Sequence, residues 1–478
     1  MNYRMITYIL GWILLFEAGF LLVPCVTALI YGEQAVKAFL LSIAICVSAS
    51  ALLILKKPKN TSLRSRDGFV IVSLSWIVLS LFGAIPFVLT GATTTFLDAL
   101  FETVSGFTTT GASIFTNVEI LPRSILIWRS FTHWVGGMGV LVFIMAFLPL
   151  SGGRNMHIMK AESPGPSVSK LVPRVRTTAL LLYSIYFALT VLQFIVMLCG
   201  GMTVFEALCT AFGTAGTGGF AIYNNGMNGF SPFLQVAIGV FMLIFSINFE
   251  SYFLLLHRKW REALTTEVVV FLSIVAAAVG IITWNLRSTF GTVGEGLRPA
   301  FFTVSSLIST TGFSTVDFDL WPELSKAVLL LLFFVGACAG STGGGVKVSR
   351  ILILFKGIAR EIGNAIHPKQ VKRVMVDGKP VEEKTVNAVF VFFVCLIVML
   401  LLSVLLLSVN GADFTTNFSA VAACIGNVGP GFAGVGPTKN FGFFSPFSKI
   451  VLIFDMLAGR LELLPMLLLF APATWKKT

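Results

Sequence analysis

The sequence predicts an all-α polytopic membrane protein with ten membrane-spanning helices, in which four repeats surround one pore behind an N-terminal helical pair. Three observations predict this fold. Of the 478 residues, 56% are hydrophobic and only 12% are charged, whereas a soluble protein carries about 25% charged residues. Apolar runs of the roughly 20 residues that a spanning helix needs recur along the chain. Between them lie four shorter segments that each lead into a polar, glycine-containing loop, and these loops align with one another.

The apolar runs define the elements in order. The first two form a helical pair, and each later pair encloses one short segment, giving four units of span, pore helix, filter loop and span. The predicted spans are 5–30, 38–55, 69–89, 125–150, 178–199, 233–256, 268–284, 327–355, 386–408 and 450–470. The chain is therefore divided into a two-helix extension (1–60) and pore repeats at 61–155, 156–262, 263–360 (with a broken second span) and 361–478 (with a C-terminal tail).

The charge distribution predicts orientation. The chain carries 34 Lys and Arg against 22 Asp and Glu, a net charge of +12. Most basic residues lie near the two ends and in alternate loops, and loops rich in Lys and Arg stay on the cytoplasmic side. Both termini and the basic loops are therefore predicted to be cytoplasmic. The charge then reports topology and contact with membrane lipids, with no nucleic acid as partner. The seven cysteines are scattered and indicate neither a disulfide framework nor a metal site.

The four aligned loops are the candidate ion filter. Short helices ahead of three of them would begin near Asp98, Glu206 and Pro299, residue types that suit a helix N-terminus. Their negative C-terminal ends would point to the bilayer centre, where loop carbonyls can replace the water shell of a cation. Packing of small residues between helices is the alternative, and the common register of four loops argues against it. The predicted filter residues are Thr108, Thr109, Thr110, Gly111, Gly216, Thr217, Gly218, Gly219, Ser309, Thr310, Thr311, Gly312, Gly426, Asn427, Val428 and Gly429.

A glycine-rich stretch interrupts the predicted span 327–355. Each glycine costs about 1 kcal/mol relative to alanine in a helix, so we predict a flexible gating loop that occludes the pore, with a packing kink as the alternative. Its residues are Gly340, Ser341, Thr342, Gly343, Gly344 and Gly345.

Arg460 lies near the middle of the last predicted span. An unpaired charge there costs at least about 2.5 kcal/mol, so the arginine must face a pore or a partner. The candidate partners are Asp455, Glu462 and the carbonyls of the gating loop. Arg460 is either a fixed positive charge below the filter or part of a structural ion pair.

Three further stretches carry a family resemblance. They are 133–139 (HWVGGMG), 336–345 (GACAGSTGGG) and 458–462 (AGRLE). Together with the four loops they resemble the Trk/Ktr/HKT superfamily of potassium transporters, and the N-terminal helical pair makes the chain most similar to the Trk-type bacterial uptake subunit. The resemblance spans nearly the whole chain. It implies potassium selectivity, because Gly111 stands where sodium-permeable members have serine, and it favours gating roles for loop 340–345 and Arg460.

The resemblance also implies partners and location. Members of the family work as homodimers on a cytosolic regulatory ring of the TrkA kind, which binds nucleotides such as NAD or ATP, in the bacterial inner membrane. The basic loops 152–176 and 357–384 are the expected docking surfaces for that ring. No covalently bound cofactor is expected, only transported K⁺ in the filter.

Two other functions stay open from the sequence alone. A proton- or sodium-coupled potassium symporter would also use broken helices near the membrane midplane, although usually in inverted repeats. A polytopic membrane enzyme would need His, Asp or Glu side chains gathered at one membrane face, and the sequence shows no such cluster, so we predict that the protein is not an enzyme. Glu102, Arg129, Glu250 and His133 are expected to be structural polar groups.

Overall fold

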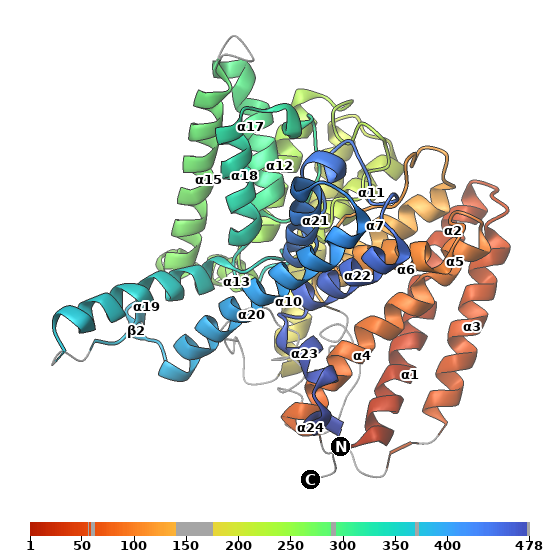
Figure 1. Cartoon of the computed structure of the whole chain (residues 1–478). Coiled ribbons are helices and arrows are strands. Elements are labelled where there is room, and N and C mark those ends of the chain that lie inside the picture. Colours follow the sequence, from red (N-terminus) through yellow and green to blue (C-terminus); the bar gives the residue numbers. More distant parts are fainter. Residues whose placement is uncertain (56, 59–62, 140–174, 288–292, 369–371, 476–478) are drawn as a thin grey trace.

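The computed structural model describes residues 1–55, 57–58, 63–139, 175–287, 293–368 and 372–475. This part of the chain is almost entirely helical (Figure 1) and contains a short antiparallel hairpin, β1 (Met375–Val376) and β2 (Lys379–Pro380). Six of its helices are long and apolar enough to cross a membrane, or seven if one bent pair is counted as a span. The predicted all-α polytopic membrane fold is confirmed. The predicted number of ten spans counts several broken helices as single ones.

The N-terminal helical pair packs against the first repeat. Its helices are α1 (Tyr3–Phe20), which continues into α2 (Leu22–Ile30), and α3 (Val36–Ile54). A Cβ added to Gly11 of α1 would meet Leu53 and Ile54 at 2.8–2.9 Å, so glycine lets α1 and α3 approach closely. In the loop after α2, the Glu33 carboxylate accepts hydrogen bonds from the backbone N–H groups of Arg123 (2.6 Å) and Ser124 (3.2 Å). The extension thereby caps the first helical turn that follows the first filter loop.

The segments predicted as the first two repeats (61–155 and 156–262) follow in order. The first contains α4 (Ser65–Gly83), α5 (Ile85–Leu89), α6 (Phe96–Phe107) and α7 (Arg123–Gly137). The second contains α10 (Val175–Cys199), α11 (Val204–Ala215), α12 (Pro232–Ser246), α13 (Phe249–Leu256) and α14 (Trp260–Ala263). Residues 140–150 of the predicted span 125–150 lie outside the described residues.

The segments predicted as the last two repeats (263–360 and 361–478) follow, with the hairpin inside the second of them, between α19 and α20. The third contains α15 (Thr266–Asn285), α17 (Val293–Ile308), η1 (Phe318–Leu320), α18 (Glu323–Val335) and α19 (Val348–Ile366). The fourth contains α20 (Glu383–Leu407), η2 (Ser408–Asn410), α21 (Phe414–Gly426), η3 (Ala433–Val435), α22 (Pro446–Arg460), α23 (Leu464–Phe470) and α24 (Pro472–Trp475). Helices α19 and α20 and the hairpin project sideways from the body (Figure 1).

The four short helices α6, α11, α17 and α21, here called the pore helices, form where the sequence predicts them. Asp98 and Glu206 lie in first turns behind the N-caps Thr95 and Thr203, as expected. The expectation for Pro299 is wrong. Helix α17 begins at Val293, so that Pro299 lies inside it, and Glu295 is the residue of the first turn. The polar residues before Pro299 read as a loop in the sequence but extend the helix.

Three predicted spans are broken helices. The break in 327–355 was predicted and separates α18 from α19. Two others were predicted as single spans and are not. Helices α12 and α13 meet at 92°, and α22 ends at Arg460 before Glu462 (φ 60°) and Leu463 (φ 65°) lead into α23. Hydropathy cannot distinguish these arrangements, because a broken helix is as apolar as a straight one, and membranes tolerate the break only where the freed backbone groups find partners.

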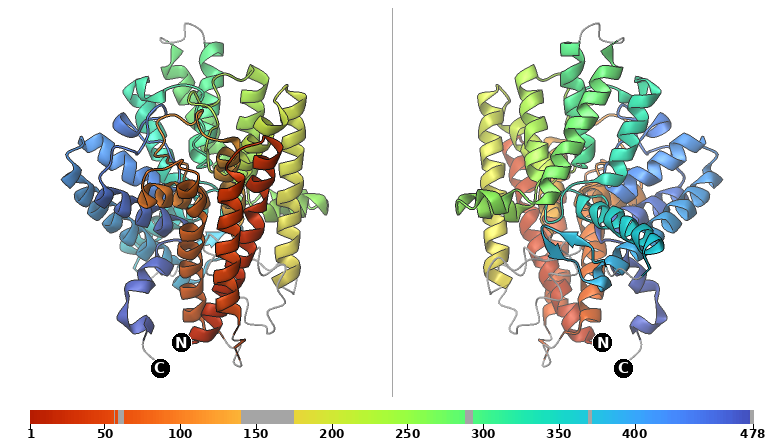
Figure 2. Two further views of the ribbon diagram at one scale, coloured as in Figure 1. Left: turned by 90° about the vertical axis from the view of Figure 1, so that its right-hand side faces the viewer. Right: turned by 90° about the vertical axis from the view of Figure 1, so that its left-hand side faces the viewer.

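Both ends of the described chain lie on the same side of the molecule (Figure 2). The Tyr3 hydroxyl donates to the Trp475 carbonyl at 3.2 Å. An even number of membrane crossings is the arrangement that brings the two ends together.

Candidate ion-binding site

The four filter loops have the same backbone conformation. In each, the residue before the glycine donates its N–H to the carbonyl five positions earlier, at 2.8–2.9 Å, which closes the C-terminus of the pore helix with the six-to-one bond of a Schellman motif. Two residues per loop have positive φ: 55°, 54°, 59° and 51° at Thr109, Thr217, Thr310 and Asn427, and 81°, 79°, 83° and 97° at Gly111, Gly219, Gly312 and Gly429. Left-handed non-glycine residues cost about 1–3 kcal/mol each and gather at functional sites.

The four glycines form a closed ring. A Cβ added to any one of them would overlap a carbonyl oxygen of the adjoining loop. The glycine–carbonyl pairs are Gly111 with Gly218, Gly219 with Thr311, Gly312 with Val428, and Gly429 with Thr110. In every pair the carbonyl belongs to the residue just before the next glycine, so the loops follow one another in the order one, two, three, four and back to one. Only glycine fits where backbones approach this closely.

A cavity of about 150 Å³ lies over this ring and is lined by all four glycines. The C-terminal ends of α6, α11, α17 and α21 lead directly into the loops beneath it. Such helix ends carry a partial negative charge, and four of them at one point favour a cation. The arrangement therefore offers backbone oxygens and helix dipoles to a dehydrated cation, and it presents no fixed positive charge among the filter residues themselves.

The loops differ in their side chains. The first and third have a hydroxyl pair, Thr108 with Thr110 at 2.8 Å and Ser309 with Thr311 at 2.7 Å. The second has Gly216 and Gly218 at those positions. In the fourth, the Asn427 amide donates to the Thr110 hydroxyl at 2.9 Å and to the Met456 carbonyl at 3.0 Å. Asn427 is thus a cross-link between the fourth loop, the first loop and α22.

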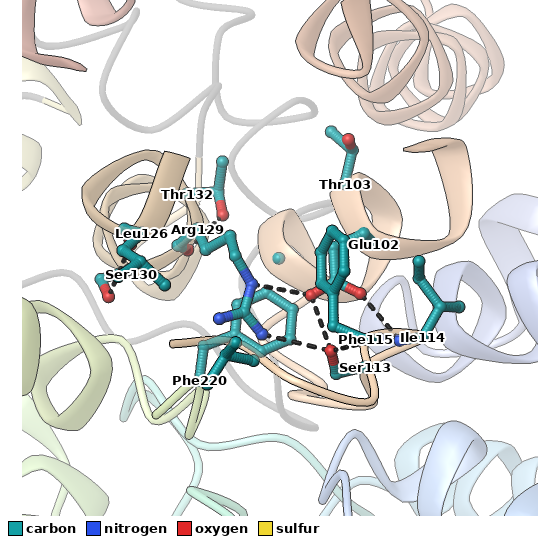
Figure 3. A network of polar contacts seen from close by, with 12 residues as sticks. Glu102, Thr103, Ser113, Ile114, Phe115, Leu126, Arg129, Ser130, Thr132 and Phe220 are labelled. Carbon is teal, nitrogen blue, oxygen red and sulfur yellow. Dashed lines mark hydrogen bonds and ion pairs between the residues drawn. The ribbon is translucent and has the colours of Figure 1, made fainter. Parts of the chain in front are cut away.

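A buried ion pair joins the segments that follow the first two loops (Figure 3). Glu102 of α6 and Arg129 of α7 are joined at 2.8 Å, and their side chains are 0% and 2% exposed. The glutamate also accepts from Ser113 and Ile114 after the first loop, at 3.0 Å each. The guanidinium donates to the Ala221 carbonyl after the second loop at 3.2 Å. Both residues are structural, as expected, and they fix the chain beyond two of the four glycines.

His133 connects the first pore helix to the second loop. Its Nδ1 lies 2.9 Å from the Gly106 carbonyl, and the Phe220 N–H donates to its Nε2 at 3.2 Å. These partners require a neutral ring with the hydrogen on Nδ1. The expected scaffold role of His133 is confirmed.

The predicted gating loop, 340–345, lies directly against the predicted filter loops. The Gly344 N–H donates to the Thr310 hydroxyl at 2.6 Å, and a Cβ at Gly344 would meet Asn427 and the Gly426 carbonyl at 2.9 Å. The bend between α12 and α13 contacts the residues just before this loop. The Cys338 N–H donates at 3.0 Å to the carbonyl of Ser246, the last residue of α12. The Phe249 N–H in turn donates to the Gly340 carbonyl at 3.1 Å. The two breaks thus satisfy each other's backbone groups.

Arg460 bonds to the gating loop and to α7. Its guanidinium donates to the carbonyls of Thr342 (3.0 Å), Gly136 (2.6 Å) and Gly137 (2.7 Å). Of the three candidate partners predicted for Arg460, the hydrogen bond to Thr342 confirms a carbonyl of the predicted gating loop. Asp455 instead accepts from Ser403 at 2.7 Å, and Glu462 pairs with Arg350. The sequence does not predict the contact of Arg460 with the C-terminus of α7, although the carbonyls at a helix C-terminus generally favour a cation.

The TrkH family, described as "Cation transport protein", matches residues 35–477. This chain belongs to the TrkH family. It is 37% identical to the Trk system potassium uptake protein TrkH of Halomonas elongata and 36% identical to that of Escherichia coli K12, over the full length of both chains in each case. It is 34% identical to TrkG of E. coli K12 over 99% of both chains. The crystal structure of the potassium transporter TrkH from Vibrio parahaemolyticus matches all of this chain with a TM-score of 0.90 at 33% identity.

Membership of the TrkH family confirms the predicted resemblance and makes this chain a transport protein rather than an enzyme. Among the described residues, no group of three or more His, Cys, Asp or Glu side chains is placed to hold a metal ion. Two charged groups beside the predicted gating loop of this TrkH-family protein have no role that the sequence predicts. They are Lys347, whose ammonium donates to the Gly343 carbonyl, and Glu267 of α15. Glu267 is distant in sequence from the loop, and Lys347 lies two positions after its end. Their contacts with the loop therefore become visible only in the folded structure.

Proposed function

We propose that this TrkH-family chain is the potassium-translocating subunit of a Trk uptake system in the bacterial inner membrane. The closed ring of four glycines and their neighbouring carbonyls is the observation that carries the proposal. The full-length relatives, which are named potassium uptake proteins, supply the identity of the ion. The sixteen predicted filter residues are the ion-binding residues, and K⁺ in the filter is the only bound group that the function needs.

The path of the ion follows from this arrangement. Of ten spans, counting each broken helix as one, eight form four repeats around the ring and two form the N-terminal pair, with both termini cytoplasmic. K⁺ exchanges its water shell for loop carbonyls at the ring. The inside-negative membrane potential contributes about 2.3 kcal/mol per charge for each 100 mV. Inward movement therefore needs no chemical step in this chain.

The gating loop 340–345 closes the path beneath the filter. The hydrogen bond from the Gly344 N–H to the Thr310 hydroxyl supports a position of the loop at the inner end of the ring. Arg460 holds the loop through the Thr342 carbonyl and adds a positive charge that disfavours a resting cation. Opening requires the loop to leave both contacts.

The partners are a second copy of the chain and a cytosolic nucleotide-binding ring of the TrkA kind. The ring is proposed to dock on the basic loops 152–176 and 357–384. Reversing the charge of Lys372 and Arg373 should abolish the response of flux to the ring and its nucleotide while leaving basal flux intact. A response of unchanged size would exclude the second loop as the docking surface.

Cation flux into proteoliposomes tests the function. We expect the purified chain to admit K⁺ in preference to Na⁺, with the membrane potential as the only driving force. A flux that requires a proton or sodium gradient would identify a coupled symporter instead. Absence of flux both without and with the purified ring subunit would refute the proposal.

A further inference from the structure

Glu267 joins the two ends of the gating-loop segment. It lies in the first turn of α15, and its Oε1 accepts hydrogen bonds from the N–H groups of Ala339 (2.7 Å) and Ser349 (2.9 Å). These donors are ten positions apart in the sequence, one just before the loop and one in the first turn of α19. A single carboxylate oxygen of another helix therefore holds the points where the loop begins and ends, which a backbone hydrogen bond from the Val348 N–H to the Ala337 carbonyl (3.1 Å) also joins.

The same carboxylate caps α19. The first N–H groups of a helix have no partner within it, and the N-cap residue of α19, Lys347, makes no side-chain capping bond. Lys347 is also held at φ 78°, in the left-handed region. Glu267 supplies the missing acceptor, and a negative charge at a helix N-terminus is favourable. The start of α19, where the gating loop ends, is thus stabilised by a hydrogen bond to one residue of α15.

The end of α15 that carries Glu267 is itself held by the hairpin. Asp377, in the turn between β1 and β2, accepts from the Thr266 N–H at 2.7 Å and from the Thr266 hydroxyl at 2.6 Å. The Lys356 ammonium of α19 donates to the Met375 carbonyl at 2.8 Å, which fixes the hairpin on its other side. Thr266 and Glu267 are adjacent, so a displacement of the hairpin acts on the residue next to the carboxylate.

We propose that Glu267 is the positioning residue that keeps the gating loop in its closed conformation, and that Asp377 of the hairpin fixes Glu267 in place. The inference rests on the proposed function of loop 340–345 as the gate. A force that draws the hairpin away from α15, on the side where the regulatory ring is proposed to bind, then removes the carboxylate that both ends of the loop share. The start of the loop is also held by the Phe249 N–H, which donates to the Gly340 carbonyl at 3.1 Å, so Glu267 acts together with that contact.

The first measurement is the accessibility of the loop, which does not depend on transport. Cys338 is buried and lies next to Ala339. We expect a small maleimide to label Cys338 about tenfold faster in Glu267→Ala than in the unaltered chain, equivalent to about 1.4 kcal/mol in the opening equilibrium. Glu267→Gln keeps an oxygen acceptor and should label close to the unaltered rate. Asp377→Ala should be intermediate. Buried Cys424 of α21 serves as the internal reference for the folded state.

Glu33→Ala is the matched control. Glu33 also caps a distant helix N-terminus through two backbone N–H groups, but that helix is α7 and not α19. Its loss should lower stability without exposing Cys338. Equal labelling of Cys338 in Glu33→Ala and Glu267→Ala would show general loosening and overturn the inference, as would an unchanged rate in Glu267→Ala.

Potassium flux through the same variants is the second measurement. Glu267→Ala should raise K⁺ flux without the ring subunit and leave the preference for K⁺ over Na⁺ unchanged, because the filter loops are not touched. Faster Cys338 labelling together with unchanged flux would contradict the assignment of loop 340–345 as the gate, which is part of the proposed function. Unchanged labelling would contradict the role of Glu267 whatever the flux.

Discussion

Replacing Gly312 by serine tests the ring directly. Gly312 has φ 83°, and an added Cβ would overlap the carbonyl oxygen of Val428. A left-handed conformation costs a non-glycine residue roughly 1–2 kcal/mol, and the carbonyl must move by on the order of 1 Å to reach van der Waals separation. A tenfold change in selectivity corresponds to about 1.4 kcal/mol, which lies within the strain that the side chain introduces. Gly312→Ser should therefore reduce the preference for K⁺ over Na⁺ about tenfold.

The assay is ²²Na⁺ and ⁸⁶Rb⁺ uptake into proteoliposomes under a fixed membrane potential, with Rb⁺ as the tracer for K⁺. Gly280→Ser is the matched control, because a Cβ at Gly280 of α15 meets nothing within 4 Å. It should keep the selectivity of the unaltered chain. A Gly312→Ser protein that is monodisperse, transports Rb⁺ and rejects Na⁺ as before would refute the proposed role of the ring.

Three further changes have defined outcomes. Arg460→Ala removes three hydrogen bonds to the gating loop and α7 and should raise K⁺ flux at normal expression; an unchanged or lower flux would exclude a closing role. Arg129→Met leaves the Glu102 carboxylate buried and unpaired, which costs about 3–5 kcal/mol, and should lower the Tm in detergent clearly more than the double change with Glu102→Gln. Thr310→Val leaves the Gly344 N–H without its acceptor, a loss of about 1–3 kcal/mol, and should increase flux through the closed state; unaltered flux would show that this contact does not hold the gate.

The candidate site was more predictable than the path of the helices. Glycine at a position where backbones meet is a requirement of geometry, so Gly111, Gly219, Gly312 and Gly429 stand out in the sequence and meet in the structure. Whether these residues bind the ion, and whether the chain divides into the predicted repeats, stay predictions. The ring order could not be read from the sequence, because it depends on how the four repeats pack.

The errors have a common physical cause. Hydropathy records that residues are apolar but not that a helix bends, so the breaks at Ile247 and at Glu462 were missed. Pro299 was assigned to a helix start because proline favours that position, yet α17 continues through it. The partners of Arg460 and Glu267 are backbone groups, which every residue carries, and a sequence therefore contains no signal for them. Side chains that bind backbone become visible only in the folded chain.

The four loops belong to one polypeptide and differ from one another, which has an evolutionary consequence. In a ring built from four identical chains, a change of one codon alters every quarter at once. Here a substitution at Gly216, Ser309 or Asn427 alters one loop and leaves the other three unchanged. Substitutions can therefore change the filter one loop at a time. The fourth loop already differs from the others in this way, because Asn427 bonds to Thr110 and Met456.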